Sequence, residues 1–167
     1  LLWLDPPPAP AVAQARELLA QLGALDADGR VTAHGRRMAA LPLHPRLAHM
    51  CLRAAALDVG ALACDLAALL AERDVLRARG GPTGDVPARW PDADVRLRLE
   101  LVRGGAIPPA VHGWEVDAAG VRRVRDEARA LRDRLRAVLG ERVARGEDRD
   151  DLAGVVLALA YPDRIAQ

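Results

Sequence analysis

Residues 15–50 read ARELLAQLGALDADGRVTAHGRRMAALPLHPRLAHM, and the turn near their centre decides the fold. Asp28-Gly29 is a dipeptide typical of tight turns, and short apolar segments flank it, which predicts a small β-hairpin over 24–32. Before the hairpin, apolar residues recur at helical spacing over 11–22. The first elements of the chain are therefore expected to be a helix and a hairpin.

A second helix is expected directly after the hairpin, over 33–41. Thr32 is a good N-cap for it, and Pro42 stops it. Glycine costs about 1 kcal/mol relative to alanine inside a helix, so Gly35 predicts that another backbone approaches this helix closely. The order helix, hairpin, helix is that of a miniature winged-helix module.

The rest of the chain predicts helices alone. Helical spacing of apolar residues, with proline and glycine at the ends, predicts five further helices, at 45–57, 60–76, 92–103, 117–139 and 148–160. Two segments rich in glycine and proline are expected to be loops, at 77–91 and 104–116. The predicted fold is mainly α, with one short β-hairpin in a winged-helix module followed by an all-α helical bundle.

Three regions follow from this pattern. Residues 1–43 form the module and a proline-rich linker over 1–10, residues 44–160 form the bundle, and residues 161–167 begin a link to a following domain. Since the sequence starts at Leu1 rather than methionine, we expect a segment of a longer protein.

The composition limits the classes of protein. The chain has no Lys, Ser, Asn or Phe, and all 24 of its basic residues are Arg, which indicates a GC-rich bacterial genome. The net charge of +1 creates no global field for nucleic acid or membranes. No secretory signal and no membrane-spanning apolar run is present, and two cysteines make no disulfide framework. A cytoplasmic protein with no membrane partner is expected.

No catalytic, cofactor-binding or metal-binding residue is predicted. A phosphate-binding P-loop requires a lysine, and a serine nucleophile requires a serine; the chain has neither residue. The one plausible set of metal ligands is His44, His49, Cys51 and Cys64. His49 and Cys51 are two residues apart and face different sides of a helix, so buried apolar cysteines are favoured over a zinc site.

Residues 121–139 carry the best candidate for function. One stripe of this helix is apolar and is expected to face the bundle, formed by Val121, Val124, Ala128, Leu131, Leu135 and Val138. A second stripe, about 100° around the helix, is basic, formed by Arg122, Arg125, Arg129, Arg132 and Arg136. Two interpretations remain open: a wall of a nucleic-acid channel that contacts phosphates, or a solvated face in which Asp126 and Asp133 pair with neighbours.

The sequence resembles the helicase-associated region of DEAH-box helicases, and within that family the bacterial HrpB branch. WLDPPP at 3–8 matches the linker that leaves the second motor domain in that family. The family pattern is matched over 22–50, at Leu22, Gly23, Ala24, Leu25, Asp26, Gly29, Thr32, Gly35, Met38, Ala39, Leu41, Pro42, Leu43, Pro45, Arg46, Leu47, Ala48 and Met50. Val31 departs from the usual leucine, and His44 stands where many members have an acidic residue.

This resemblance implies an accessory region of an ATP-dependent helicase, whose ATP and Mg²⁺ would be bound by motor domains outside this chain. Single-stranded RNA or DNA and those motor domains are the implied partners, and the helical bundle would be the ratchet that lines the strand's exit path. In that setting Arg125, Arg129 and Arg132 are expected to contact phosphates, whereas Arg46 is expected to pair with an acidic residue rather than a phosphate.

Two other classes of function are compatible with the same predicted helices and hairpin. In a non-enzymatic winged-helix regulator of DNA, the helix over 33–41 would enter the major groove with His34, Arg36 and Arg37 facing bases. A helical adaptor would bind only other proteins.

The isolated chain is expected not to hydrolyse ATP, because it has no lysine with which to build a P-loop. A steady-state phosphate-release assay on the purified chain measures this. Hydrolysis that a point substitution within 1–167 abolishes would contradict the prediction.

Overall fold

The computed structural model describes residues 7–78, 95–104, 106, 107, 109–111, 114–140 and 149–164. Helices make up most of these residues, so the prediction of a mainly α fold is confirmed. The helices are α1 (Ala9–Gln21), α2 (Ala33–Ala39), α3 (Pro45–Ala55), α4 (Gly60–Ala71), α5 (Val95–Arg103), α6 (Ala118–Leu139) and α7 (Ala153–Ala160). Two 3₁₀ turns flank α7, namely η1 (Asp150–Leu152) and η2 (Pro162–Arg164).

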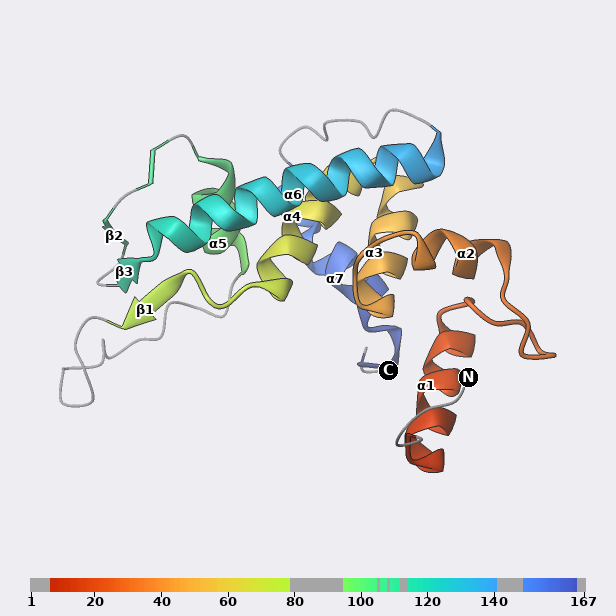
Figure 1. Ribbon diagram of the computed structural model, residues 1–167. Helices are drawn as coiled ribbons and strands as arrows, with labels where there is room; N and C mark the ends of the chain where they lie inside the picture. Colours follow the sequence, from red (N-terminus) through yellow and green to blue (C-terminus); the bar gives the residue numbers. More distant parts are fainter. Residues whose placement is uncertain are drawn as a thin grey trace.

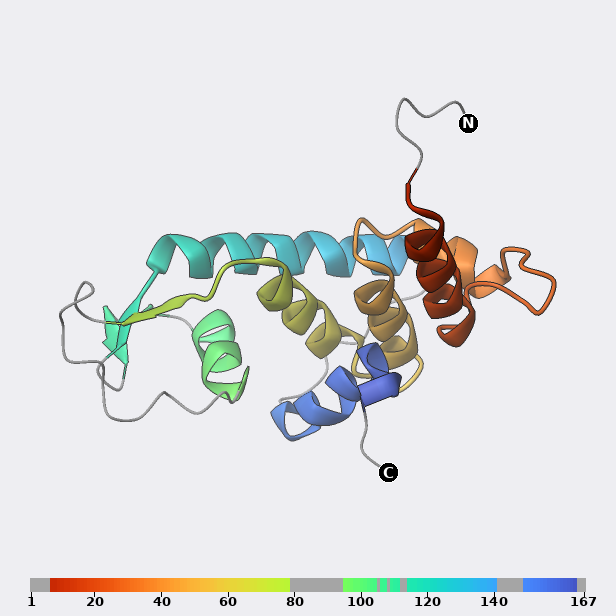
Figure 2. The ribbon, with the colours of Figure 1, turned by 90° about the horizontal axis from the view of Figure 1, so that it is seen from below.

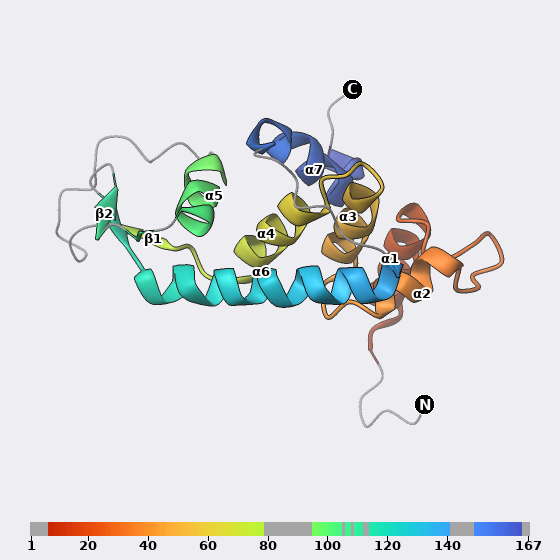
Figure 3. The ribbon, with the colours of Figure 1, turned by 90° about the horizontal axis from the view of Figure 1, so that it is seen from above.

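The helix α4 lies at the centre of the bundle. Residues 60–68 of this helix are all buried, and every one of them except Asp65 is small or apolar. It packs against α3, α5, α6 and α7. Figures 1, 2 and 3 show α6 running as one long helix across the bundle, with α1 and α2 at one end of the molecule and a small sheet at the other.

The N-terminal elements follow the predicted order of helix, turn and helix. The expected hairpin is reduced to a single antiparallel bridge between Leu25 and Val31. Within the turn, the Asp26 carboxylate accepts hydrogen bonds from the backbone N–H groups of Asp28 and Arg30, at 3.0 and 2.8 Å. The tight turn therefore forms with only one bridge beside it.

Thr32 and Gly35 join α2 to that turn. The Thr32 hydroxyl donates to the Gly23 carbonyl at 2.7 Å and accepts from the Gly35 N–H at 2.9 Å, so it caps α2 as predicted. A Cβ atom on Gly35 would lie 2.3 Å from the Ala24 carbonyl oxygen. The predicted close approach of another backbone at Gly35 is thus confirmed.

A three-stranded antiparallel sheet corrects the expectation of a single hairpin near Asp28-Gly29. The strands β1 (Leu76–Ala78), β2 (Ala110–Val111) and β3 (Trp114–Val116) lie in the order β1-β3-β2. They fall at the end of the helix predicted over 60–76 and within segments predicted as loops. Pairing between residues about 40 positions apart, such as Leu76 with Val116, leaves no periodic signal in either segment.

The predicted helix over 60–76 ends five residues early, at Ala71. Beyond it, the Asp74 carboxylate accepts from the Leu76 N–H at 3.1 Å and pairs with Arg98 of α5 at 2.6 Å. These contacts turn the chain into β1, where Leu76 is buried. Tertiary contacts with α5 and β3 therefore override the helical tendency of this segment.

The remaining helices lie close to the predicted ones, but α1 begins two residues early, at Ala9, and the last predicted helix starts as the 3₁₀ turn η1 before α7 begins at Ala153. The side chain of Asp117 caps the start of α6 by accepting from the Gly120 N–H at 2.9 Å, and Gly140 ends it in the left-handed conformation with φ of 69°. The predicted apolar stripe of α6 faces the bundle. Several predictions lie outside the described residues, namely the linker at 1–6, the segment 79–94, the start of the last helix and the link at 165–167.

Replacing Gly35 by alanine is expected to lower the free energy of unfolding by about 1–3 kcal/mol, because the new methyl group would overlap the Ala24 carbonyl. Gly154→Ala is the matched control, since a Cβ atom there meets nothing within 4 Å. Urea unfolding followed by circular dichroism measures both variants. Equal stability of the two variants would contradict the prediction.

Candidate nucleic-acid interface

Three of the five predicted arginines lie on the outer face of α6. Arg122 and Arg129 are exposed, and Arg136 is partly exposed. They are seven residues apart, so they form a nearly straight row with a spacing of about 10 Å along the helix. This row lies on the long helix that crosses the bundle in Figure 3.

The ion pairs of this row are weak. Arg129 pairs with Asp126 at 3.2 Å and Arg136 pairs with Asp133 at 2.7 Å, each within one turn of α6 and open to solvent. Arg122 makes no ion pair with any residue that the structure describes. Because exposed pairs of this kind contribute about 0–1 kcal/mol, these guanidinium groups can exchange a carboxylate for a phosphate at little cost.

Arg125 is turned into the bundle. Its Nε donates to the Val102 carbonyl at 2.8 Å, and its Nη2 donates to the carbonyls of Leu101, at 2.9 Å, and Gly104. The last carbonyl groups of a helix have no partner within the helix, so a cation there satisfies hydrogen bonds as well as charge. Arg125 therefore fastens the C-terminal end of α5 to α6.

Arg132 belongs to a partly buried ionic cluster. Its Nη1 donates to Oδ1 of Asp65 in α4, and Nε of Arg103 in α5 donates to Oδ2 of the same carboxylate at 2.9 Å. Arg103 also donates to Asp150 in η1. Asp65 is 5% exposed and is the one buried charged residue among those that the structure describes. The cluster joins four separate elements of the bundle.

The predicted basic stripe therefore divides into two groups. Arg122, Arg129 and Arg136 remain available to a ligand, whereas Arg125 and Arg132 hold the bundle together. Replacement of Arg125 or Arg132 is therefore expected to destabilise the bundle. Sequence spacing placed all five on one side of α6, but it did not reveal that α4 and α5 cover one edge of that side.

A second group of charges lies where α6 begins. Arg123 pairs with Glu72, directly after α4, at 3.2 Å, and Arg77 of β1 pairs with Asp117 at 2.7 Å. A backbone hydrogen bond from Gly120, followed by the charges of Arg77 and Arg123, lowers the pKa of Asp117. These pairs position the sheet against α6, and no pattern in the sequence predicted them.

Arg46 pairs with an acidic residue, as predicted. Its guanidinium donates to both carboxylate oxygens of Asp163, at 2.6 and 2.9 Å, and to the Ala160 carbonyl at 3.1 Å. The same group lies 5.3 Å from the centre of the Tyr161 ring. Arg46 thereby anchors η2 to the start of α3, and its donors face protein rather than ligand.

The predicted set of metal ligands separates into two pairs and a cap. His44 caps α3, and His49 lies beside His34, with 2.9 Å between His34 Nε2 and His49 Nδ1. Cys51 and Cys64 are both buried, and their mutual hydrogen bond followed by burial raises the pKa of the Cys51 thiol. The described residues contain no group of three or more side chains that could hold a metal ion.

In the alternative of a DNA-binding regulator, the side chains of α2 would have to be available to contact bases. His34 faces His49 of α3, and Arg36 donates to the Val31 carbonyl at 2.9 Å. Arg37 is exposed. Two of the three proposed base-reading side chains are thus engaged within the protein.

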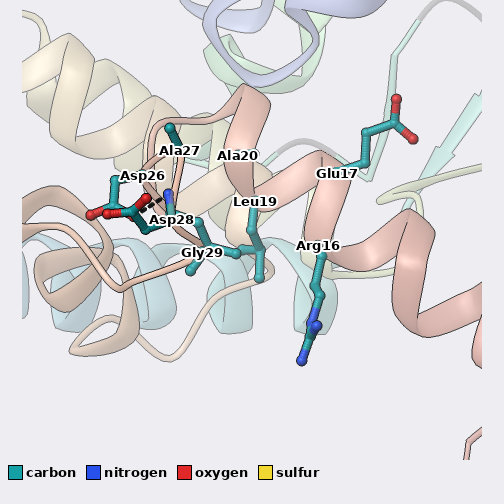
Figure 4. A pocket seen from close by; sticks show the side chains of 9 residues that line it. Arg16, Glu17, Leu19, Ala20, Asp26, Ala27, Asp28 and Gly29 are labelled. Carbon is teal, nitrogen blue, oxygen red and sulfur yellow. Dashed lines mark hydrogen bonds between the residues drawn. The ribbon is translucent and has the colours of Figure 1, made fainter.

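An open hollow lies between α1 and the turn at 26–29. Its lining includes Arg16 and Glu17, which point away from each other and from the turn in Figure 4. On the opposite side, Asp26 is satisfied by the backbone of its own turn. Since no polar groups converge on this hollow, it has no features of a ligand site.

The comparisons with known proteins agree with these features. A family model described as the helicase-associated domain (HA2), winged-helix, matches residues 15–43. The chain is 35% identical over 147 residues to the ATP-dependent RNA helicase HrpB of Escherichia coli, an alignment covering 82% of this chain and 18% of that protein. The chain is a helicase-associated region of the HrpB type.

A second relative matches a shorter part of this helicase-associated region. The probable ATP-dependent RNA helicase DHR2 of Saccharomyces cerevisiae is 38% identical over 60 residues, or 36% of this chain and 8% of that protein. The helicase-associated region spans less than a fifth of each of these relatives. Among the residues described, none of its helices has the length and apolar character needed to cross a membrane.

Asp65→Asn is expected to lower the free energy of unfolding by about 3–5 kcal/mol, because it leaves Arg103 and Arg132 without a buried counter-charge. Asp133→Asn is the matched control, since it removes a carboxylate from an exposed pair worth less than about 1 kcal/mol. Chemical unfolding at neutral pH measures the difference. Equal losses in the two variants would show that the buried cluster contributes no more than a surface pair.

Proposed function

We propose that this helicase-associated region guides single-stranded nucleic acid, RNA in the first instance, through the outer face of α6. The observation that carries the proposal is the straight row of Arg122, Arg129 and Arg136, whose side chains face solvent with weak or no ion pairs. A row of cations on a rigid helix suits contacts with the phosphates of a nucleic-acid strand that lies along it.

The proposed contacts are with phosphates and not with bases. The described side chains of α6 include no aromatic residue on which a base could stack. Phosphates carry no base identity, so the interaction would be independent of sequence. Such a surface suits a protein that must hold a strand at any position while it moves.

The catalytic activity belongs, in this proposal, to the longer parent protein. The two relatives are named as an ATP-dependent RNA helicase and a probable one. By that analogy the parent hydrolyses ATP with Mg²⁺ in motor domains outside this chain, and it acts in the cytoplasm. The winged-helix module at 1–43 would connect those motors to the helical bundle at 44–160.

The inward-facing arginines of α6 support the proposed role of its outer row. Arg125 and Arg132 fix α6 to α5 and α4, so the outer row is held on a rigid surface. A rigid row costs less conformational entropy when it binds a strand than flexible side chains on a loop.

In the parent helicase, changing Arg122, Arg129 and Arg136 together to Gln is expected to weaken single-strand binding similarly across sequences. It should flatten the log–log salt dependence of the binding constant by up to about 2 units, given about 0.7 unit for each phosphate contact. Folding should be retained, because the three side chains make only exposed contacts. Fluorescence anisotropy with labelled oligonucleotides over a salt series measures the slope.

The matched control is Arg134→Gln. Arg134 is also exposed on α6, about 140° around the helix from Arg129. This variant should keep the affinity and salt dependence of the wild type. A triple variant whose slope equals that of the wild type would move the strand path away from α6.

A further inference from the structure

A pair of histidines joins α2 to the bundle. Nε2 of His34 lies 2.9 Å from Nδ1 of His49 in α3, and the two rings meet edge to face with their centres 5.0 Å apart. At this distance one nitrogen must donate a proton and the other must accept it. The contact therefore requires that at least one of the facing nitrogens carries no proton.

The charged groups around the pair all have the same sign. Arg37 follows His34 by about one turn of α2, and Arg53 follows His49 by about one turn of α3, so each lies on the face of its helix that carries the histidine. These are the two charged residues that act on His34, and no described carboxylate compensates them. His49 also forms a hydrogen bond with the backbone of Leu22, at the end of α1.

We propose that the His34–His49 pair is an acid-sensitive latch, which holds the ends of α1 and α2 against α3 when both rings are neutral and opens when they take up protons. A second proton would leave no acceptor between the rings. It would instead place two N–H groups and two positive rings in contact, beside Arg37 and Arg53.

The direction of the pH effect follows from the surroundings. Burial, and then the charges of Arg53 and Arg37, lower the pKa of His34. Burial, and then His34 and Arg53, lower the pKa of His49, while the hydrogen bond with Leu22 partly opposes this. In the open state both rings would titrate near pH 6.5. The latch is therefore fully closed above about pH 6.5. It loses stability as the pH falls through the lowered pKa values that the two rings have in the closed state.

The number of protons that the two histidines take up determines how strongly a fall in pH shifts the latch towards its open state. Each histidine can raise the ratio of open to closed latch by up to about tenfold per pH unit within its window. Opening should be local, because α1 has no buried residue and α2 buries only Gly35 and Met38. By contrast, α4 and α6 are held by the central core and should stay folded.

Hydrogen–deuterium exchange of the 167-residue chain at pH 7.5, 6.5, 5.5 and 5.0 tests the latch. After correction for the chemical exchange rate, the amides of α2 should lose protection at least tenfold between pH 7.5 and 5.0, while those of α6 keep it. The double variant His34→Gln with His49→Asn should abolish this loss. Its amide groups reach the same positions and form a hydrogen bond, but they do not titrate.

His44→Asn is the matched control, since His44 is exposed and asparagine also caps a helix well. It should keep the pH dependence of the wild type. Equal pH dependence in the wild type and the double variant, or loss of protection in α2 and α6 together, would overturn the proposal.

A titration of the wild-type ring protons by NMR gives a second test that does not depend on the variant's folding. Both rings of the pair should titrate below pH 6.5. A pKa at or above 6.5 for His34 and His49 alike would also overturn the proposal.

Discussion

The arrangement of the bundle depends on the carboxylate of Asp65. A charge buried in a helix of alanine and leucine would be strongly unfavourable alone, so it requires partners from neighbouring elements. Arg132 of α6 and Arg103 of α5 meet it from two directions, and Arg103 extends the cluster to Asp150 beside α7. One buried charge on the central helix thus joins α5, α6 and η1 to α4.

Because the chain has no lysine, arginine supplies the positive charge of this network. Every cation is an arginine, whose planar group donates several hydrogen bonds at once and keeps its charge when partly buried. Arg125 reaches three carbonyl groups, and Arg46 joins a carboxylate, a carbonyl and an aromatic ring. Much of the basic charge is therefore structural, and a count of arginines overstates the surface available to nucleic acid.

The two ends of the molecule are held by different forces. The bundle around α4 has a continuous apolar core reinforced by the Asp65 cluster, whereas the module of α1 and α2 contributes few buried residues. Within the module, the close approach at Gly35 and the cap of Thr32 hold α2 to the preceding turn, and the histidine pair joins α2 to α3. The bundle is therefore held by more buried contacts than the module of α1 and α2.

The sequence by itself determined most of the helices, the cap at Thr32, the close approach at Gly35 and the helicase-associated family, because each of these depends on local propensity or on a contiguous motif. It also placed the apolar stripe of α6 against the core. Only the tertiary structure decided which arginines of α6 are free, since that depends on where α4 and α5 lie. For the same reason the β1-β3-β2 sheet and the pairing of His34 with His49 were invisible in the sequence: their partners are separated in the chain and are brought together only by the packing of the bundle.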